Sequence, residues 1–512
     1  MGEHLRDLRL RMAELADLGH VSALAHWDQQ TKMPHGGGAA RAESLATLER
    51  ISHDLFTADE TGRLLEGAER ETATADPASD DACLVRLVRR DWDKARRVPT
   101  DLASDLAHAA STGQEAWVTA RATSDFAAFA PALERNFELA RRYVDCHLGH
   151  DGYECAYDVM LDDYEPEMRT KTVAALFGEL TEALVPFVSR LTSEGSVPDD
   201  ALLYSEAPIE RQRELVADAI SMMGFSPETW RMDDTVHPFA TRIGAGDVRI
   251  TTRWDETYFP TALYGAMHEC GHGLYEAGVA PTLARSPLGA GESLGMHESQ
   301  SRMWENMVGR GRPFGTVLAP LVARRLGGAL ASVAPDELHR AVNRVKPSFI
   351  RVEADEATYS LHIVLRFELE QRLVDGSLAV QDLPEAWNQR FHELFGIEVQ
   401  DDAEGVLQDV HWAAGLIGYF PTYALGNLIA GQLWDCVHAA VPDLDDQLAA
   451  GQLAGLRGWL RENIHRHGAK FTTGELLARA GAGPISVAPF TRYLTDKLGR
   501  VYGLDTSADG PL

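Results

Sequence analysis

The stretch from residue 266 to residue 275 constrains this chain most, because it places His-Glu-x-x-His in a helix-forming segment. Residues four apart lie on one helix face about a turn apart, so His268 and His272 can bind the same metal ion. Glu269 points to the side of that face, where a reacting water would lie. Two imidazoles, a third ligand and a carboxylate base make up a zinc hydrolase site. The same pattern also arises by chance in buried helices, so the rest of the chain has to support it.

Composition narrows the possible partners. The 512-residue chain has ordinary hydrophobic and charged contents and a net charge of −29, a surface that repels nucleic acid and anionic membranes. Its five cysteines are scattered, without a Cys-x-x-Cys pattern, which predicts reduced thiols in a cytoplasmic protein. The N-terminus runs straight into an amphipathic acidic pattern, so we expect no signal peptide there.

One uncharged stretch, from residue 411 to residue 434, is long enough to span a membrane. However, Pro421 interrupts it, and polar side chains and several glycines lie within it. We therefore interpret this stretch as the buried wall of a cleft.

Helical patterns fill most of the chain. They cover residues 1–60 with a break at 34–38, 80–150 in segments that include 102–137 and 139–148, 168–225 with a break at 198–200, and 316–512. In the first segment, we expect the apolar face to contain Leu5, Leu8, Leu10, Met12, Leu15 and Leu18. Because no repeat, low-complexity tract or clear linker interrupts the chain, we predict one catalytic domain over residues 1–512.

The helical pattern gives way to β-prone runs just before the His-Glu-x-x-His segment. Two short β-prone runs, 237–243 and 248–254, flank a Gly-Ala-Gly-Asp turn and predict a β-hairpin. An exposed edge strand can pair with the backbone of an extended peptide, so the hairpin is either a substrate contact or a structural element.

A third metal ligand is expected from the next helix, which begins near residue 296. Glu298 lies 26 residues beyond His272, and a carboxylate there can turn back to a metal on the preceding helix. On spacing alone, Glu292 and Glu305 are equally possible.

Six short motifs in a fixed order now define a family resemblance. They are His237-Pro238-Phe239; Asp247-Val248-Arg249-Ile250-Thr251; His268 to His272; His297-Glu298-Ser299-Gln300; Ile350-Arg351-Val352-Glu353-Ala354-Asp355; and Gly405-Val406-Leu407-Gln408-Asp409-Val410-His411-Trp412. With these motifs the chain resembles the carboxypeptidase Taq family of thermostable zinc metallocarboxypeptidases, and segments 27–34 and 462–468 extend the resemblance over nearly the whole length.

The resemblance implies a mainly helical, two-lobed fold with a deep central groove and a small hairpin or sheet beside the metal-binding helix. It implies a homodimer that releases C-terminal amino acids from peptides with broad specificity. It also implies that Glu298 is the third ligand, beside His268 and His272. The expected cofactor is Zn²⁺, for which Co²⁺ can substitute because both suit nitrogen and oxygen ligands.

Two polar residues of the uncharged wall are candidates to stabilise the developing oxyanion. In this hypothesis zinc activates the water, Glu269 takes its proton, and His411 or Tyr423 donates to the carbonyl oxygen. The alternative for each is a buried, hydrogen-bonded side chain.

An exopeptidase must also bind a terminal carboxylate, and a guanidinium does so with two parallel hydrogen bonds. Arg351 is the first candidate and Arg249 the second. Arg351 can instead form a structural ion pair with Glu353 or Asp355. We expect His237 to line the groove.

Two other functions fit parts of the pattern. A zinc endopeptidase or oligopeptidase on a similar scaffold has the same His-Glu-x-x-His and glutamate pattern. A non-catalytic metal-binding protein is the second alternative, and Glu269 argues against it because a structural site has no use for a base. The preferred side chain, the physiological substrate and the native metal are left open.

Overall fold

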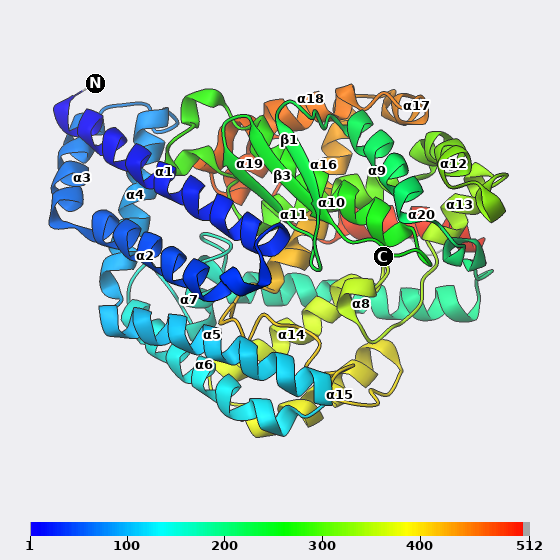
Figure 1. The fold of residues 1–512 in the computed structure, drawn as a ribbon, viewed down its shortest axis with the longest axis horizontal. Helices are drawn as coiled ribbons and strands as arrows, with labels where there is room; N and C mark the ends of the chain where they lie inside the picture. Colours follow the sequence, from blue (N-terminus) through cyan, green and yellow to red (C-terminus); the bar gives the residue numbers. More distant parts are fainter. Residues whose placement is uncertain (1, 505–512) are drawn as a thin grey trace. The chain divides into compact units, whose positions relative to one another are not determined.

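The computed structural model describes residues 2–504, which form a mainly helical fold with one small sheet (Figure 1). The prediction of a mainly helical fold with a small sheet beside the His-Glu-x-x-His helix is confirmed. By internal contacts the described chain divides into two compact units. Unit 1 lies within residues 1–96, 199–342 and 433–484, and unit 2 lies within 97–198, 343–432 and 485–512.

Unit 1 contains the sheet and the His-Glu-x-x-His helix. Its helices are α1 (Glu3–Thr31), η1 (His35–Gly37), α2 (Gly38–Thr57), α3 (Asp59–Thr72), α4 (Asp80–Arg97), η2 (Ala201–Tyr204), α9 (Ile209–Met223), α10 (Pro260–Gly278), η3 (Pro281–Leu283), η4 (Pro287–Gly289), α11 (Leu294–Arg302), the π-helix η5 (Met303–Gly309), α12 (Arg312–Leu326), η6 (Gly328–Leu330), α13 (Pro335–Val342), α17 (Leu444–Ala449), α18 (Ala454–Asn463), η9 (His465–Lys470) and α19 (Thr473–Arg479).

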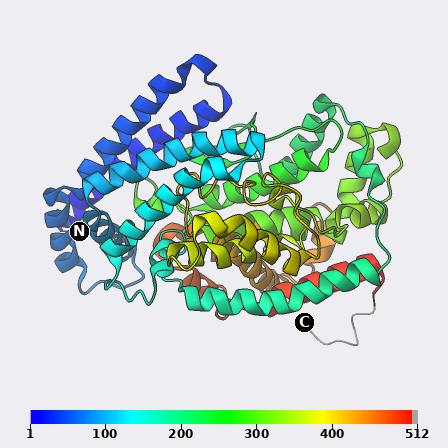
Figure 2. The ribbon, with the colours of Figure 1, turned by 90° about the horizontal axis from the view of Figure 1, so that it is seen from below.

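The first helix of unit 1 buries a narrower face than the sequence suggested. Leu5, Leu8 and Met12 of α1 are buried, but Leu10 is 61% exposed, so its placement on the apolar face was wrong. Leu10 lies two residues from both Leu8 and Met12, and two residues turn the helix by about 200°, close to its opposite side. Figure 2 shows α2 running beside α1, and along α2 no residue is buried.

The sheet has three strands in the order β1-β3-β2. The predicted hairpin is present as β2 (Ala240–Gly244) and β3 (Asp247–Thr252), which pair antiparallel around a turn in which Gly246 has φ +77°. The strand β1 (Trp230–Asp234), which pairs parallel with β3, was not predicted. Two aspartates at its end weaken the β-propensity of this strand, and a parallel partner leaves no turn signal.

Two glycines of α10 allow it to pack closely against its neighbours in unit 1. A side chain at Gly273 would meet the ring of Trp230 at 2.3 Å, so only a glycine lets the helix lie on the sheet there. At Gly271 a Cβ would lie 2.7 Å from Cα of Ser301 on α11. The glycine inside the His-Glu-x-x-His pattern thus sets the distance between the two helices that carry the predicted ligands.

Unit 2 is built from long helices and extended loops. Its elements are α5 (Thr100–Thr123), α6 (Phe126–His147), α7 (Ala156–Asp162), α8 (Thr170–Ser193), η7 (Arg351–Glu353), α14 (Tyr359–Val374), η8 (Val380–Asp382), α15 (Leu383–Phe395) and α20 (Ala488–Tyr502), and the boundary between the units falls within α16 (Pro421–Ala440).

The break between the two predicted helical segments 102–137 and 139–148 was misplaced, because the structure has it between α5 and α6, at Ser124 and Asp125. Ser124 adopts the left-handed conformation with φ 52°, and the carboxylate of Asp125 accepts a hydrogen bond from the Ala128 N–H as the cap of α6. Serine and aspartate are common at helix ends for this reason, and the apolar pattern alone hid them.

Within residues 2–504, one helix is long and apolar enough to cross a membrane by length and composition, and it is α8 rather than the uncharged stretch at 411–434. Core helices share these properties. The α8 residues Phe177, Leu184 and Phe187 are buried, so we interpret α8 as a core helix of unit 2.

Candidate metal and substrate-binding site

Two consecutive helices of unit 1 carry the predicted ligands. The helix α10 begins with Pro260, whose fixed φ suits a first helical turn, and it carries His268, Glu269 and His272. The hydroxyl of Ser293 caps α11 by accepting from the Met296 N–H, and Glu298 follows in the next turn. The cap at Ser293 fixes where α11 begins, and this start determines which helix face carries Glu298.

The ligand atoms of His268, His272 and Glu298 all lie within 4.8 Å of one another. Oε2 of Glu298 is 3.7 Å from Nε2 of His268 and 3.4 Å from Nε2 of His272. Two imidazole nitrogens and one carboxylate oxygen thus converge on a single point.

The other ring nitrogens of the two histidines have different partners. Nδ1 of His268 lies 2.9 Å from Oε2 of Glu305, whereas Nδ1 of His272 lies 2.7 Å from Nδ1 of His297. In turn, Nε2 of His297 lies 2.8 Å from Oε1 of Glu276. We assign the protons to Nδ1 of both histidines from these contacts, which leaves both Nε2 lone pairs facing Glu298.

The two rival carboxylates lie elsewhere. Glu305 contacts the outer nitrogen of His268, so it supports a predicted ligand from behind. Glu292 accepts a hydrogen bond from the hydroxyl of Thr473 at 3.1 Å.

Glu305 lies in the π-helix η5, directly after α11. Such wide turns are frequent at functional sites because they change the direction of side chains. Two arginines hold the carboxylates in place: Arg302 Nε donates to Glu298 Oε1 at 2.6 Å, and Arg310 Nη1 donates to Glu305 Oε1 at 2.5 Å.

The pKa values separate these carboxylates into two kinds. Burial disfavours the charged form of Glu298, but Arg302 and the two histidines lower its pKa overall, so it is ionised. By contrast, burial raises the pKa of Glu269 to about 7, and the charges of Glu298 and Glu305 act in the same direction. Of these carboxylates beside the predicted ligands, Glu269 has the pKa suited to exchanging a proton near neutral pH.

The donor set fits a divalent metal ion. Two bare imidazole nitrogens and an ionised carboxylate, all at one point, repel each other unless a cation lies between them. Two histidines and one carboxylate are a common set for catalytic zinc, and outer partners such as Glu305 orient the ligands.

In unit 2, Arg351 is buried in an ion-pair cluster. Its Nε and Nη2 donate to Oδ1 of Asp409 at 3.0 and 2.6 Å, and its Nη1 donates to the hydroxyl of Tyr359 at 2.9 Å. Arg366 donates to the other oxygen of Asp409 at 2.7 Å. The alternative that paired Arg351 with Glu353 or Asp355 was wrong about the partner, because the loop at 405–412 brings Asp409 to Arg351.

The two residues proposed for the oxyanion lie together in unit 2. Nε2 of His411 is 3.2 Å from the hydroxyl of Tyr423, and the guanidinium of Arg351 lies 5.0 Å above the Tyr423 ring. Burial is the main reason that the pKa of His411 falls to about 3, so the ring is neutral.

The other two candidates belong to unit 1. Arg249 on β3 binds both oxygens of Asp247 at 2.9 and 2.8 Å and lies 4.2 Å above the ring of Trp27. His237 precedes β2 and is exposed. For both residues, substrate contact stays a prediction.

Several residues of these clusters were not singled out from the sequence. Glu276 lies four residues after His272, and His297 directly precedes Glu298, so helical spacing and adjacency were available signals. Asp409 lies two residues before His411. The burial of Arg366 could not be predicted in the same way, because no spacing or neighbouring motif distinguishes it from an arginine on an exposed helix face.

A mainly helical fold with a His-Glu-x-x-His helix and a third carboxylate on the next helix defines a metallopeptidase. The comparisons narrow this class. A family model described as carboxypeptidase Taq (M32) metallopeptidase matches residues 7–498. Thermostable carboxypeptidase 1 of Thermus thermophilus is 41% identical over 507 residues, 98% of this chain and 99% of that protein.

Other relatives agree. Carboxypeptidase 1 of Bacillus subtilis is 38% identical over 95% of this chain and 97% of its own length. The crystal structure of an M32 carboxypeptidase from Deinococcus radiodurans R1 matches with a TM-score of 0.94 at 37% identity, covering 98% of this chain and 100% of that one. The chain belongs to the carboxypeptidase Taq (M32) family, and it is a metallocarboxypeptidase, a peptide hydrolase that uses a divalent metal.

Proposed function

We propose that this enzyme is a zinc-dependent carboxypeptidase that releases C-terminal amino acids from peptides with broad specificity. One observation carries the proposal: the ligand atoms of His268, His272 and Glu298 lie within 4.8 Å of one another, beside the buried carboxyl of Glu269. His268, His272 and Glu298 would hold the ion. Cobalt can substitute because it accepts the same ligands.

Zinc held there would act as a Lewis acid on the scissile carbonyl and on the attacking water. Glu269 takes the proton from the water as it attacks and delivers the proton to the leaving amine. A pKa of about 7 makes this carboxyl both a usable base and a usable acid near neutral pH. The arginines on Glu298 and Glu305 keep those two carboxylates ionised, so they do not compete for the proton.

The arginine cluster of unit 2 has the composition of a carboxylate site. Two guanidiniums, Arg351 and Arg366, share the single carboxylate of Asp409, so the cluster keeps an excess positive charge. We propose that the guanidinium of Arg351 binds the terminal carboxylate of the peptide, which neutralises this excess charge. Arg249, which pairs with both oxygens of Asp247, is the second candidate.

His411 and Tyr423 are proposed as hydrogen-bond donors to the oxyanion. A neutral His411 has one N–H and Tyr423 has one O–H. Their mutual hydrogen bond uses one of these two protons, so the other is left to donate to the oxyanion. His237 is proposed to line the substrate-binding region.

Three further properties complete the proposal. We propose a single catalytic domain because the family model spans residues 7–498. We propose a cytoplasmic enzyme because all five cysteines are free thiols. The homodimer rests on the family resemblance alone.

The test uses one peptide in two forms, with a free and with an amidated C-terminus, and follows amino acid release with and without a chelator. We expect stepwise release from the free form, loss with the chelator, and recovery with added Zn²⁺. Internal cleavage of the amidated form would instead support an endopeptidase. No cleavage of either form under any condition would contradict a catalytic function.

A further inference from the structure

We propose that His297 and Glu276 are positioning residues for the metal ligand His272. They hold Nδ1 of His272 as an N–H donor, so that its Nε2 keeps the lone pair that binds the metal. The inference rests on the proposed zinc site and goes beyond it, because it assigns a role to two residues that are neither ligands nor the base.

Three side chains form one continuous row of hydrogen bonds. Nδ1 of His272 lies 2.7 Å from Nδ1 of His297, and Nε2 of His297 lies 2.8 Å from Oε1 of Glu276. All three side chains are at most 18% exposed. Since His272 and Glu276 lie one turn apart on α10, His297 on α11 bridges two positions of the same helix.

The direction of the protons follows from the two ends of the row. An ionised carboxylate can only accept, so the nitrogen of His297 that faces Glu276 carries the proton. A metal bound at Nε2 of His272 requires the lone pair there, so the proton of that ring lies on Nδ1. The 2.7 Å contact then requires a bare, accepting Nδ1 on His297, and a proton on the nitrogen of His297 that faces Glu276 satisfies both ends of the row.

The backbone at Gly291 and the ring of Tyr275 pack closely around the ring of His297. A Cβ at Gly291 would lie 2.5 Å from Cδ2 of His297, so a glycine is needed for the backbone to approach the ring. The Gly291 N–H also donates to Oε1 of Glu276 at 3.1 Å. On another side, the ring of Tyr275 lies 5.0 Å from the ring of His297, centre to centre.

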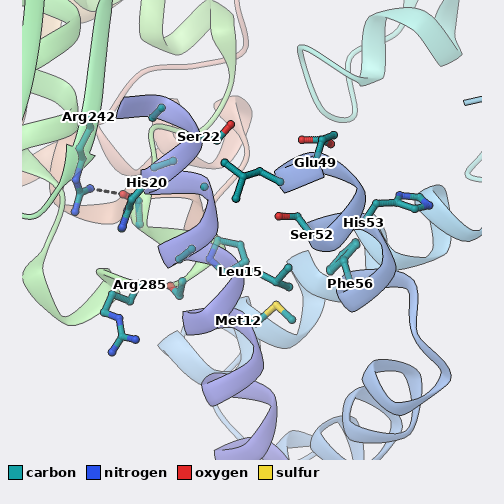
Figure 3. A pocket seen from close by; sticks show the side chains of 18 of the residues that line it. Met12, Leu15, His20, Ser22, Glu49, Ser52, His53, Phe56, Arg242 and Arg285 are labelled. Carbon is teal, nitrogen blue, oxygen red and sulfur yellow. Dashed lines mark hydrogen bonds between the residues drawn. The ribbon is translucent and has the colours of Figure 1, made fainter. Parts of the chain in front are cut away.

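The Glu276 end of the row reaches the wall of a cavity of about 660 Å³ beside α1 and α2. Figure 3 shows Arg242 and Arg285 on one side of this cavity and the α2 residues Glu49, Ser52 and His53 on the other. Arg242 Nη1 lies 4.0 Å from Oε2 of Glu276, and this charge favours the ionised carboxylate that the row requires.

The two metal ligands are thus oriented differently. His268 meets a carboxylate directly, at Glu305, whereas His272 reaches its carboxylate through a second imidazole. An imidazole can adopt the opposite tautomer, so only the carboxylate behind it keeps it an acceptor. For this reason Glu276 is as necessary as His297.

The test measures zinc affinity by chelator competition in the full-length protein. His297→Phe keeps a ring but removes the acceptor, and Glu276→Leu removes the carboxylate. We expect each to weaken zinc binding by about 10- to 100-fold, the usual effect of losing an outer partner of a ligand. His297→Gln can both accept and donate, and it should lose less than His297→Phe.

Glu292→Leu is the matched control, because it removes a neighbouring carboxylate outside the row and should leave the affinity unchanged. Melting of the metal-free proteins checks folding, and if His297→Phe does not fold, Glu276→Leu decides. Wild-type affinity in both variants, or an equal loss in the control, would overturn the inference. A wild-type protein that binds no zinc would instead contradict the proposed function.

Discussion

The cluster around His268 in unit 1 and the cluster around Arg351 in unit 2 are both buried and charged, but their charge balance is opposite. Around His268, four carboxylates outnumber three guanidiniums: those of Glu269, Glu276, Glu298 and Glu305 against those of Arg242, Arg302 and Arg310. Around Arg351, two guanidiniums share one carboxylate, that of Asp409.

This difference matches the partners that each cluster can accept. Burying an unbalanced charge costs free energy unless a partner of opposite charge arrives. A divalent cation neutralises the excess of carboxylates in unit 1, and a carboxylate would neutralise the excess guanidinium in unit 2. A carboxypeptidase needs both partners, its metal and the terminal carboxylate of its substrate.

The largest effect is expected from Glu269→Gln, which removes the one carboxyl of the unit 1 cluster that has a pKa near neutrality. Turnover should fall by about 10²- to 10⁴-fold, since the proton acceptor is lost. Zinc content, measured by metal analysis, and melting temperature should stay close to wild type. If the variant retains full activity, Glu269 is not the base.

A second prediction concerns Glu370 of unit 2, a buried carboxyl whose side-chain partners are an indole and a phenol. Trp412 Nε1 donates to its Oε1 at 2.7 Å, and Tyr157 binds its Oε2. Burial raises the pKa of Glu370 to about 7 in the folded protein, above its ordinary value of 4.5. The folded state therefore binds this proton more tightly than the unfolded state does.

The sign of the pH dependence follows from this raised pKa. The stability from neutral Glu370 is fully present below about pH 4.5 and is lost as pH rises through about 7, by up to about 3 kcal/mol. Glu370→Gln imitates the neutral form, so denaturant unfolding should show wild type losing stability relative to the variant over this range. A constant difference between pH 4 and 8 would contradict the raised pKa.

Third, Arg351→Ala should separate recognition of the carboxylate from the chemistry of the metal cluster. Loss of a charge-assisted hydrogen bond costs about 1.5–3 kcal/mol, roughly a 10- to 100-fold loss of kcat/KM for peptides with a free C-terminus. Amidated peptides should lose much less. The ratio of the two rates is the measurement, because partial unfolding lowers both equally, and an unchanged ratio would indicate a structural role.

The smallest effect is expected at Gly271, where the close approach of α10 and α11 sets the spacing of the metal ligands. In Gly271→Ala the new Cβ meets the backbone of Ser301 and Gln300 at 2.7–2.8 Å, which should cost about 1–3 kcal/mol of stability. Gly265→Ala on the same helix meets only Thr252 Oγ1 at 3.5 Å, so it should be neutral or slightly stabilising. Thermal unfolding of both variants tests the difference, and an equal response would show that the helices adjust freely.

The sequence was most informative where the chemistry is local. The two histidines and Glu269 share one helix, so their spacing along the chain is enough to place them together. The hairpin at β2 and β3 was predictable for the same reason, since its turn carries glycines. The strand β1 was missed because its partner is parallel and leaves no such mark.

By itself, the sequence determined the helical class of the fold, the position of the metal-binding pattern and the family, because all of these depend on residue type and spacing along the chain. Tertiary structure decided which carboxylate faces the histidines, because Glu292, Glu298 and Glu305 are equivalent on spacing. It also decided that Arg351 pairs with Asp409, 58 residues away, and that His297 and Glu276 lie behind His272. Partners of this kind depend on the packing of α11 against α10 through Gly271 and on the path of the loop at 405–412, and neither is written in local periodicity.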